Sequence, residues 1–549
     1  MSGAPNAKVN ADSRSAADGW RVLAVAAVLT LAALGAYWNS FSVPLQLDDQ
    51  WAIVNNPSIR HLRRMGDVLS PPPIGPTAAR PLLNLTLAVN FAGDDVSVRG
   101  YHVVNWLIHV CAGLVLLGIV RRTLLLPGLR SRYGEAALPL AACAALLWTL
   151  HPLQTESVTY ISQRAESLMG LFYLLTLYGF IRASASQFSD MGATPMPRLP
   201  VAAGGTGVPL ADLQKTEMRL WLSLSTGACL CGMATKQVMV TAPVLVLLYD
   251  RAFIGGSFRS ALTNRRWYYA SLAATWIWLG FLMHRSSLIA IGAGFQAGIS
   301  WPMYALTELR VVTNYLRLAL WPHPLVFDYG TEIYVTDPLL VLPYALIVVA
   351  ILVVVVIAWC RSPMAGFLGC WFFLILAPTS TVVPVATQPM AESRMYLPLA
   401  AVVVLVTLLS YEPGRRRAFV FLGIVAIGLG ALTVWRNHDY RSEVSIWEDT
   451  LAKNPYSSRG HCQLGMAFAK IPGQLPAAIA QYEEAVRLKP DFVDARNDLA
   501  VIYAETGRLD AAIEQMEIAA RLNPASTGIR YNLEKMKARN RPDAGRSIP

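Results

Sequence analysis

Residues 22–38, VLAVAAVLTLAALGAYW, form an apolar run without a charged residue, and the acidic stretch Leu47-Asp48-Asp49-Gln50 follows it. The run begins after Arg21 and ends in Tyr37-Trp38-Asn39-Ser40, without a small-residue cleavage pattern. We therefore interpret it as an uncleaved membrane anchor rather than a signal peptide. The acidic stretch stands where this anchor gives way to a polar loop.

The composition of the whole chain is typical of a membrane protein. Hydrophobic residues make up 54% and charged residues 15% of the 549 residues, whereas ordinary soluble domains carry about 25% charged residues. Since a transmembrane helix needs about 20 mostly apolar residues, we predict an all-α fold, a polytopic transmembrane helical bundle of about eleven spans. The candidate spans are 22–38, 103–120, 136–150, 167–182, 219–235, 237–250, 267–283, 339–359, 364–378, 396–411 and 418–435.

Basic residues in the short loops predict the orientation of these spans. With a cytoplasmic N-terminus, Arg121-Arg122, Arg265-Arg266 and Arg415–Arg417 all fall on the cytoplasmic side, as the positive-inside rule expects. The net charge of +11 is thereby explained, and no nucleic-acid partner is expected. The half-apolar stretch 301–320 is predicted to be an interfacial helix, because a twelfth span would move Arg415–Arg417 to the outer side.

A repeat pattern follows the last apolar run. Pro455, Pro490 and Pro524 recur at intervals of 35 and 34 residues, which is typical of tetratricopeptide repeats. Such repeats bind peptides or partner proteins on a concave surface, or here merely cap the membrane domain, and both interpretations stay open. The predicted domains are a disordered N-terminus (1–20), a membrane domain (21–436), the repeats (437–540) and a disordered tail (541–549).

Conspicuous polar clusters fall on the outer side of the predicted bundle. The first is the pair Asp48-Asp49, in which mutual repulsion should raise the pKa of one carboxyl, a property that suits a general base. A solvated loop start is the alternative, and an interfacial Arg–Glu network is the alternative for Arg164 and Glu166. The remaining outer polar clusters contain His151, Glu156, Arg164, Glu166, Lys236, Asp328, Glu392 and Arg394.

Cations near an acidic pair describe a site for an anionic leaving group opposite a base. No Gly-rich nucleotide cradle, Walker motif or Rossmann fingerprint occurs in the sequence, so a lipid-phosphate donor is favoured over a nucleotide-activated one. His151 and Glu156 are five positions apart and lack the spacing of a helical zinc pair. No cofactor is expected to be required, and a divalent metal is not predicted.

The order of the motifs carries a resemblance to a known family. The motifs are Leu47-Asp48-Asp49, Ala79-Arg80-Pro81-Leu82, Gly100-Tyr101-His102-Val103-Val104-Asn105, the block from His151 to Glu166, Ala234-Thr235-Lys236, Phe327-Asp328-Tyr329, and Glu392 through Pro398. Together with C-terminal tetratricopeptide repeats, they resemble the transmembrane-and-tetratricopeptide O-mannosyltransferase family, in particular its bacterial relatives. That family lies within the membrane-integral C-type glycosyltransferase superfamily.

The resemblance implies an inverting transfer of a sugar from a polyprenyl-phosphate carrier to a hydroxyl of an exported protein, generally without a required metal. It aligns Asp48 with the proposed base and Asp49 with the second acidic position. It makes Arg164, Lys236 and Arg394 candidates for binding the donor phosphate. The supporting polar residues that it implies are Arg80, His102, His151, Glu156, Glu166, Asp328 and Glu392.

The sequence departs from the family pattern at two positions. Gln237 stands where the family often has Glu after the lysine, and Ser393 separates Glu392 from Arg394. The first departure puts a Lys–Glu pairing in doubt, and the second puts the direction of Arg394 in doubt.

The expected location is a bacterial inner membrane, with the site and the repeats facing the periplasm. The expected partners are a polyprenyl-phosphate-linked sugar, an exported protein acceptor that the repeats could bind, and membrane lipids. The alternative functions are a non-enzymatic scaffold or lipid-carrier transporter with partner-binding repeats, and an oligosaccharide ligase or metal-assisted oligosaccharyltransferase on the same scaffold.

Overall fold

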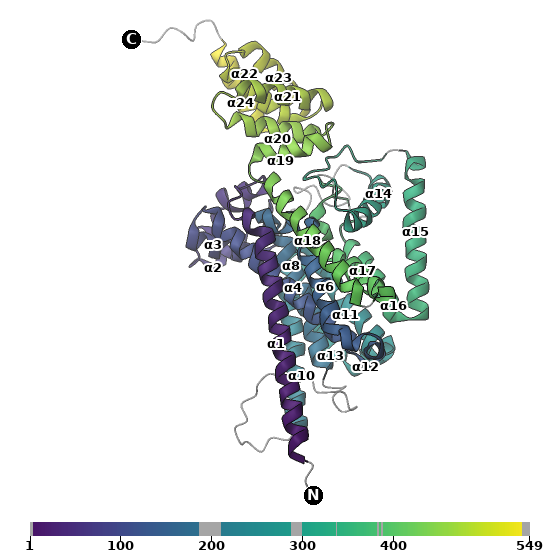
Figure 1. Ribbon diagram of the computed structural model, residues 1–549. Coiled ribbons are helices and arrows are strands. Elements are labelled where there is room, and N and C mark those ends of the chain that lie inside the picture. The colour runs from purple at the N-terminus through teal and green to yellow at the C-terminus, as the bar shows by residue number, and fades with distance from the viewer. Residues whose placement is uncertain are drawn as a thin grey trace. The chain divides into compact units, whose positions relative to one another are not determined.

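The computed structural model describes residues 4–185, 210–286, 299–335, 337–381, 384–385, 388–414 and 416–540. Within these residues every regular element is a helix (Figure 1). The chain forms two compact units. The membrane unit comprises Met1–His323, Val335–Val385 and Glu392–His438, and the repeat unit comprises Pro324–Tyr334, Ala386–Ala391 and Asp439–Pro549.

Each of the eleven predicted apolar runs lies in a helix of the membrane unit. The run 237–250 is the least regular of them, because a 3₁₀ turn, Gln237–Thr241, precedes its α-helix. These helices are α1 (Ala4–Tyr37), α4 (Val98–Leu124), α6 (Ala137–Thr149), α8 (Arg164–Ser184), α10 (Leu210–Met233), α11 (Ala242–Tyr249), α13 (Arg266–His284), α15 (Pro338–Arg361), α16 (Pro363–Leu376), α17 (Pro398–Gly414) and α18 (Arg416–Asp439).

Fewer helices than the predicted eleven are long and apolar enough to cross a membrane. Among the described residues six helices qualify, or up to seven if the pair Pro127–Thr149 and Pro152–Thr159, bent by 54°, is one broken span. The predicted count of eleven is not confirmed, but the chain is a multi-pass membrane protein. The six are Gly19–Ser40, Val98–Leu124, Ile161–Ser184, Gln237–Ile254, Pro338–Arg361 and Arg416–Asp439.

Shorter helices of the membrane unit lie between these segments. α3 begins with Pro81, whose fixed φ suits the first position of a helix. The predicted interfacial stretch 301–320 is the helix α14, and its placement along the membrane stays a prediction. The shorter helices are α2 (Met65–Val68), α3 (Pro81–Asp94), α5 (Pro127–Tyr133), α7 (Thr155–Thr159), α12 (Phe258–Asn264) and α14 (Trp301–Leu320).

A small apolar core fixes the loop that follows α1. Its buried side chains include Ile53 from this loop, Leu87 from α3 and Ala165 from α8. Burial of such side chains contributes roughly 1.5–3 kcal/mol each. This core therefore holds the acidic stretch and α3 against the beginning of α8, and these are the segments that carry the polar motifs.

The repeat unit confirms the tetratricopeptide prediction. The small residues Ala478, Ala485, Ala512 and Ala519 are fully buried where helices cross. Two turns with left-handed glycines, Gly473 and Gly507, recur one repeat apart, each at a φ of 82°. The helices are α19 (Glu443–Lys453), α20 (Ser458–Ala469), α21 (Leu475–Leu488), α22 (Val493–Glu505), α23 (Leu509–Leu522) and α24 (Thr527–Arg539).

The repeat unit also contains a loop from far upstream, Pro324–Tyr334. The Phe327 ring packs edge-on against Trp447, with ring centroids 5.4 Å apart. Arg459 forms an ion pair with Asp328, with 3.2 Å between Nε and Oδ2. The repeats therefore include a segment that a single boundary at residue 437 leaves out.

Candidate functional site

The acidic pair is divided by its surroundings. The Asp49 carboxylate is buried and accepts two backbone hydrogen bonds, from Gln46 N–H (2.9 Å) and Ser162 N–H (2.7 Å). Asp48 is exposed, and its backbone N–H donates to the Tyr160 hydroxyl (2.9 Å). Asp49 therefore fastens the acidic loop to the segment before α8, while Asp48 stays exposed.

The electrostatics of the pair agree with this division. Burial raises the pKa of Asp49 to about 7, against the opposing effect of the Gln46 and Ser162 hydrogen bonds, and the Asp48 charge adds to the rise. A raised pKa in one member of the pair was the expectation from the sequence. The residue it falls on is the buried one.

Arg80 reaches the same region from the beginning of α3. Its Nη1 donates to the Pro76 carbonyl (2.8 Å). Burial lowers the pKa of Arg80, and the nearby charges of Glu166 and Asp48 oppose that shift. Leu82 N–H donates to the Ala234 carbonyl (3.1 Å), which ties α3 to the motif that contains the predicted lysine.

The backbone is strained directly before Asp48 and directly before Arg80. Leu47, directly before Asp48, has a φ of 31°, and Ala79, directly before Arg80, has a φ of 59°. Residues with a β-carbon seldom adopt positive φ, and such strain costs about 1–3 kcal/mol and concentrates at functional sites. Two strained turns in one cluster favour a functional interpretation of the cluster.

Lys236 forms the central ion pair of the cluster. Its Nζ lies 2.5 Å from Oε1 of Glu166, and the two side chains are 15% and 3% exposed. Burial lowers the pKa of Lys236; Glu166 raises it, and the charges of Arg80 and Arg394 lower it further. The partner missing at Gln237 is therefore supplied by Glu166 in the first turn of α8.

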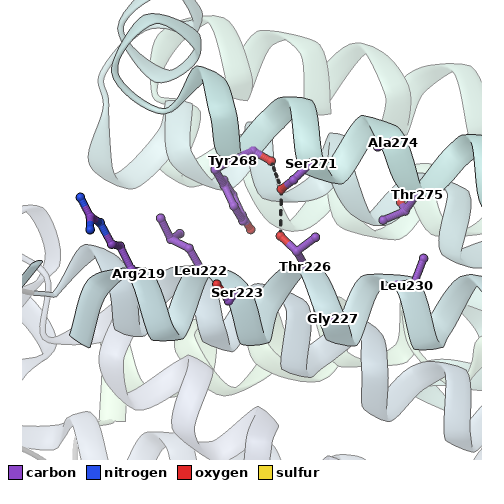
Figure 2. A pocket seen from close by; sticks show the side chains of 10 residues that line it. All are labelled: Arg219, Leu222, Ser223, Thr226, Gly227, Leu230, Tyr268, Ser271, Ala274 and Thr275. Atoms are coloured by element: carbon purple, nitrogen blue, oxygen red, sulfur yellow. Dashed lines mark hydrogen bonds between the residues drawn. The ribbon is translucent and has the colours of Figure 1, made fainter. Parts of the chain in front are cut away.

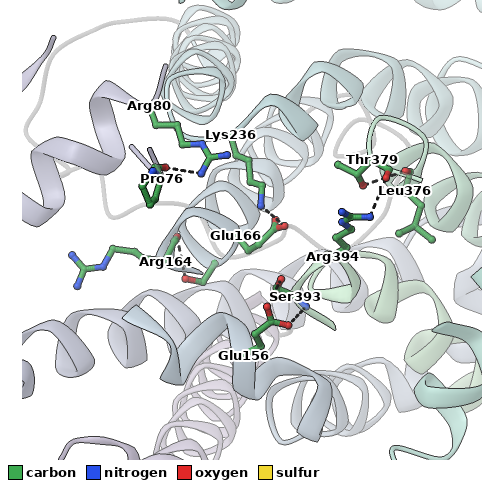
Figure 3. Close-up of polar contacts among 11 residues, drawn as sticks. Pro76, Arg80, Glu156, Arg164, Glu166, Lys236, Leu376, Thr379, Ser393 and Arg394 are labelled. Carbon is green, nitrogen blue, oxygen red and sulfur yellow. Dashed lines mark hydrogen bonds and ion pairs between the residues drawn. The ribbon is translucent and has the colours of Figure 1, made fainter. Parts of the chain in front are cut away.

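Arg394 completes the cluster from the segment before α17 (Figure 3). Its Nη1 donates to the Thr379 carbonyl (3.1 Å) and lies 4.0 Å from Oε1 of Glu308. Burial raises the pKa of Glu308 to about 7, against the opposing charge of Arg394. Sequence reasoning missed Glu308, although a single acid in the half-apolar α14 was a signal that could have found it.

Ser393 explains why the Glu392–Arg394 pair is split. Its backbone N–H donates to Oε2 of Glu156 (2.8 Å) and its hydroxyl to Oε1 (3.0 Å). Glu392, directly before Ser393, is also buried. The serine between Glu392 and Arg394 thus connects the segment of Arg394 to Glu156 on α7.

Arg164 belongs to the scaffold rather than to the cluster. It is fully buried, and its guanidinium donates to Asn105 Oδ1 (2.5 Å), Asn90 Oδ1 (2.7 Å) and the Tyr101 carbonyl (2.9 Å). Figure 3 shows it pointing away from Glu166, as expected for helix positions two apart. Its geometry does not bring it to the other predicted phosphate-binding residues.

Three further predicted residues lie in structural contacts. His102 Nε2 donates to the Val43 carbonyl (2.8 Å), and His151 Nε2 donates to the Ala319 carbonyl (3.2 Å). Asp328 belongs to the repeat unit, where Arg459 and Gly330 N–H hold its carboxylate. Within the described ranges no group of three or more His, Cys, Asp or Glu side chains could hold a metal ion, and the expected independence from metals stays a prediction.

Comparison with known proteins gives two kinds of match. The tetratricopeptide repeat family matches residues 473–527. The protein O-mannosyl-transferase TMTC4 of Mus musculus is 27% identical over 514 residues, which are 83% of this chain and 65% of the mouse protein. The protein O-mannosyl-transferase F38B6.6 of Caenorhabditis elegans is 22% identical over 461 residues, which are 81% of this chain and 60% of the worm protein.

The chain is thus similar, over most of its length, to proteins named as O-mannosyl-transferases. It spans somewhat less than two thirds of the length of these relatives, 65% of the mouse protein and 60% of the worm protein. Among solved structures, ArnT from Cupriavidus metallidurans bound to undecaprenyl phosphate is similar with a TM-score of 0.39 and 15% sequence identity. The matched region covers 91% of this chain and 80% of the ArnT chain.

Proposed function

We propose that this relative of the O-mannosyl-transferases is an inverting glycosyltransferase that moves a sugar from a polyprenyl-phosphate carrier to a hydroxyl, of Ser or Thr, in an exported protein. The single observation that supports it best is that the exposed residue Asp48 interacts electrostatically with Arg80, which in turn interacts with Lys236, and Lys236 with Arg394. The cluster acts at the outer face of the membrane, which in a bacterium is the periplasmic face of the inner membrane.

In this proposal Asp48 is the general base. Its carboxylate takes the proton from the acceptor hydroxyl as the hydroxyl oxygen forms a bond to the anomeric carbon. The bond between that carbon and the phosphate oxygen breaks, and its electron pair leaves with the polyprenyl phosphate. Attack from the face opposite the phosphate inverts the anomeric configuration.

The cations stabilise the leaving group. The donor is a phosphodiester, so cleavage turns one negative charge into the greater charge of a phosphate monoester. Preorganised cations accelerate a reaction when they bind the charge that develops in the transition state more tightly than they bind the donor. Lys236 and Arg394 are assigned this role, and Arg80 lies between Asp48 and Lys236 in the network of charges.

Asp49 and Arg164 are assigned to positioning. Asp49 accepts hydrogen bonds from the backbone on both sides of the acidic loop, and Arg164 joins α8 to α3 and α4. The repeats are assigned to binding of the protein acceptor, since tetratricopeptide arrays present concave surfaces to peptides.

The first prediction tests Asp48 as the base. We expect Asp48→Asn to reduce transfer at least 100-fold, because general bases contribute about 10²–10⁴-fold. The measurement is transfer of radiolabelled mannose from a short-chain polyprenyl-phosphate mannose to Ser/Thr peptides by the full chain in detergent. Asp67→Asn, which changes an exposed acid of α2 outside the cluster, is the matched control and should retain activity. A folded, fully active Asp48→Asn variant would overturn the assignment.

A further inference from the structure

A groove lies between α10 and α13, outside the candidate site (Figure 2). It measures about 690 Å³, within the range of about 300–1,000 Å³ typical of ligand sites. The α10 wall follows the spacing of one helix face, so it is continuous along the helix. The lining residues are Arg219, Leu222, Ser223, Thr226, Gly227 and Leu230 from α10, and Tyr268, Ser271, Ala274 and Thr275 from α13.

The interior of the groove is apolar in effect. The hydroxyls of Thr226 and Ser271 are hydrogen-bonded to each other (3.0 Å), and the Cys229 thiol contacts the Thr275 hydroxyl (3.4 Å). These contacts also show that the two helices run parallel, because both residue numbers rise together. The hydroxyls in the middle of the lining are therefore occupied, and the groove offers an occupant mainly hydrocarbon.

The rims of the groove are suited to lipid. Leu220 and Leu224, which follow the lining residues Arg219 and Ser223 on α10, are exposed, and Trp267 is 77% exposed at the end where α13 begins. Tryptophan is enriched at membrane interfaces. Exposed aliphatic side chains along the groove and an aromatic side chain at one end describe a surface that faces acyl chains and ends at a headgroup layer.

Arg219 closes the end of the groove at which α13 begins. Its side chain is exposed, and within the described part of the chain no carboxylate forms an ion pair with it. Figure 2 shows Arg219 at one end of the row of α10 residues and Leu230 at the other. Eleven helical steps of 1.5 Å separate them, about 16 Å, which is close to half of the ~30 Å hydrocarbon core of a bilayer.

We propose that this groove binds one anionic glycerophospholipid of the membrane, with the phosphate at Arg219 and an acyl chain along Gly227 toward Leu230. The length of the groove matches the acyl chain of a single leaflet, which is far shorter than a polyprenyl carrier. The charge at its end matches an anionic headgroup. This site is separate from the proposed transfer site, and its test does not depend on glycosyl transfer.

The experiment is a native mass spectrometry titration of the full chain in detergent. The probes are dioleoyl phosphatidylglycerol and dioleoyl phosphatidylcholine, which share their acyl chains and differ in net charge. We expect wild type to bind the anionic lipid at least tenfold more tightly, about 1.4 kcal/mol. Arg219→Gln should remove this preference. Arg259→Gln, the same change at an exposed arginine of α12 that does not line the groove, should keep it.

Gly227→Leu tests the acyl chain. A β-carbon at Gly227 meets no atom within 4 Å, so the added side chain enters the groove without displacing its neighbours. It should weaken binding of both lipids, and Ala274→Leu provides the same block from the opposite wall if the first variant does not fold. An Arg219→Gln variant with unchanged preference overturns the proposal. So does groove-dependent binding of undecaprenyl phosphate in preference to phosphatidylglycerol, or a dimer of the chain that Gly227→Leu abolishes.

Discussion

Asp48 and Asp49 are neighbours in the sequence with opposite surroundings. Asp49 has both oxygens in backbone hydrogen bonds, and Asp48 is exposed at the edge of a group of cations. Burial disfavours the ionised form of a carboxyl, and the two backbone hydrogen bonds to Asp49 offset this effect only in part, so the buried member carries the raised pKa. The difference supports the proposed division of roles, in which Asp49 anchors the loop and Asp48 takes the proton.

Asp49 should make stability depend on pH. Its pKa is about 7 in the folded protein and about 3.9 when unfolded, so between pH 4 and 7 the folded state binds more protons. Stability then falls as pH rises through this window and levels off above it, by at most about 4 kcal/mol from this group. Asp49→Asn removes the titration and should flatten the fall in thermal-unfolding temperature between pH 5 and 7.5.

The control for this prediction is Asp67→Asn, which changes an exposed acid of α2 and should keep the wild-type slope. Equal slopes in wild type and Asp49→Asn would show that Asp49 does not bind the extra proton.

At this scale the sequence predicts the kinds of residue better than their roles. It predicted an acidic pair with one raised pKa, and cations at Lys236 and Arg394. It did not distinguish Asp49 from Asp48, because the distinction depends on Ser162, more than a hundred residues away in the chain. Arg164 was grouped with the cations because two positions on one helix cannot be assigned to opposite sides before the neighbouring helices are known.

The first turn of α8 is the element that organises the cluster. Glu166 points from it toward Lys236, and Arg164 points back to α3 and α4. The Lys236–Glu166 pair is almost fully buried, and removing one partner of such a pair costs about 3–5 kcal/mol because the other charge is left uncompensated. The pair therefore has a structural role besides the proposed role of Lys236 toward phosphate.

A double-mutant cycle separates these two roles. Lys236→Met alone should lower the unfolding temperature strongly, and adding Glu166→Gln should restore most of the stability by removing the unpaired carboxylate. Transfer activity should stay low in the double variant, because the cation is still missing. Thermal unfolding and transfer from polyprenyl-phosphate mannose measure the two effects. Recovery of activity together with stability would show that Lys236 acts only through Glu166.

For the whole molecule, the periodic signals were predictable and the long-range ones were not. The recurrence of Pro455, Pro490 and Pro524 predicted the helices of the repeat unit. The span count was not confirmed because helices such as α6 and α16 are short, and α10 begins with several charged residues. The membership of Pro324–Tyr334 in the repeat unit depends on contacts with residues beyond 439, which no local pattern reveals.

The ion pair that holds this loop is more buried than another ion pair of the repeat unit. The Asp328 side chain is 4% exposed and pairs with Arg459, whereas Lys470 and Glu443, elsewhere in the same unit, form a pair whose side chains are 51% and 25% exposed. Exposed pairs contribute about 0–1 kcal/mol, and loss of a partner costs a buried carboxylate more. Arg459 should therefore matter to the loop much more than Lys470.

Hydrogen exchange of the full chain can measure this difference. Arg459→Met should accelerate exchange of residues 324–334 at least fivefold, about 1 kcal/mol of lost local stability, because Asp328 loses its cation. Lys470→Met, the matched removal of an exposed cation, should leave exchange in that loop unchanged. Asp328→Asn in the Arg459→Met background should recover part of the protection, since the uncompensated charge is gone. Equal exchange in Arg459→Met and Lys470→Met would mean that Phe327 and its aromatic neighbours hold the loop without the ion pair.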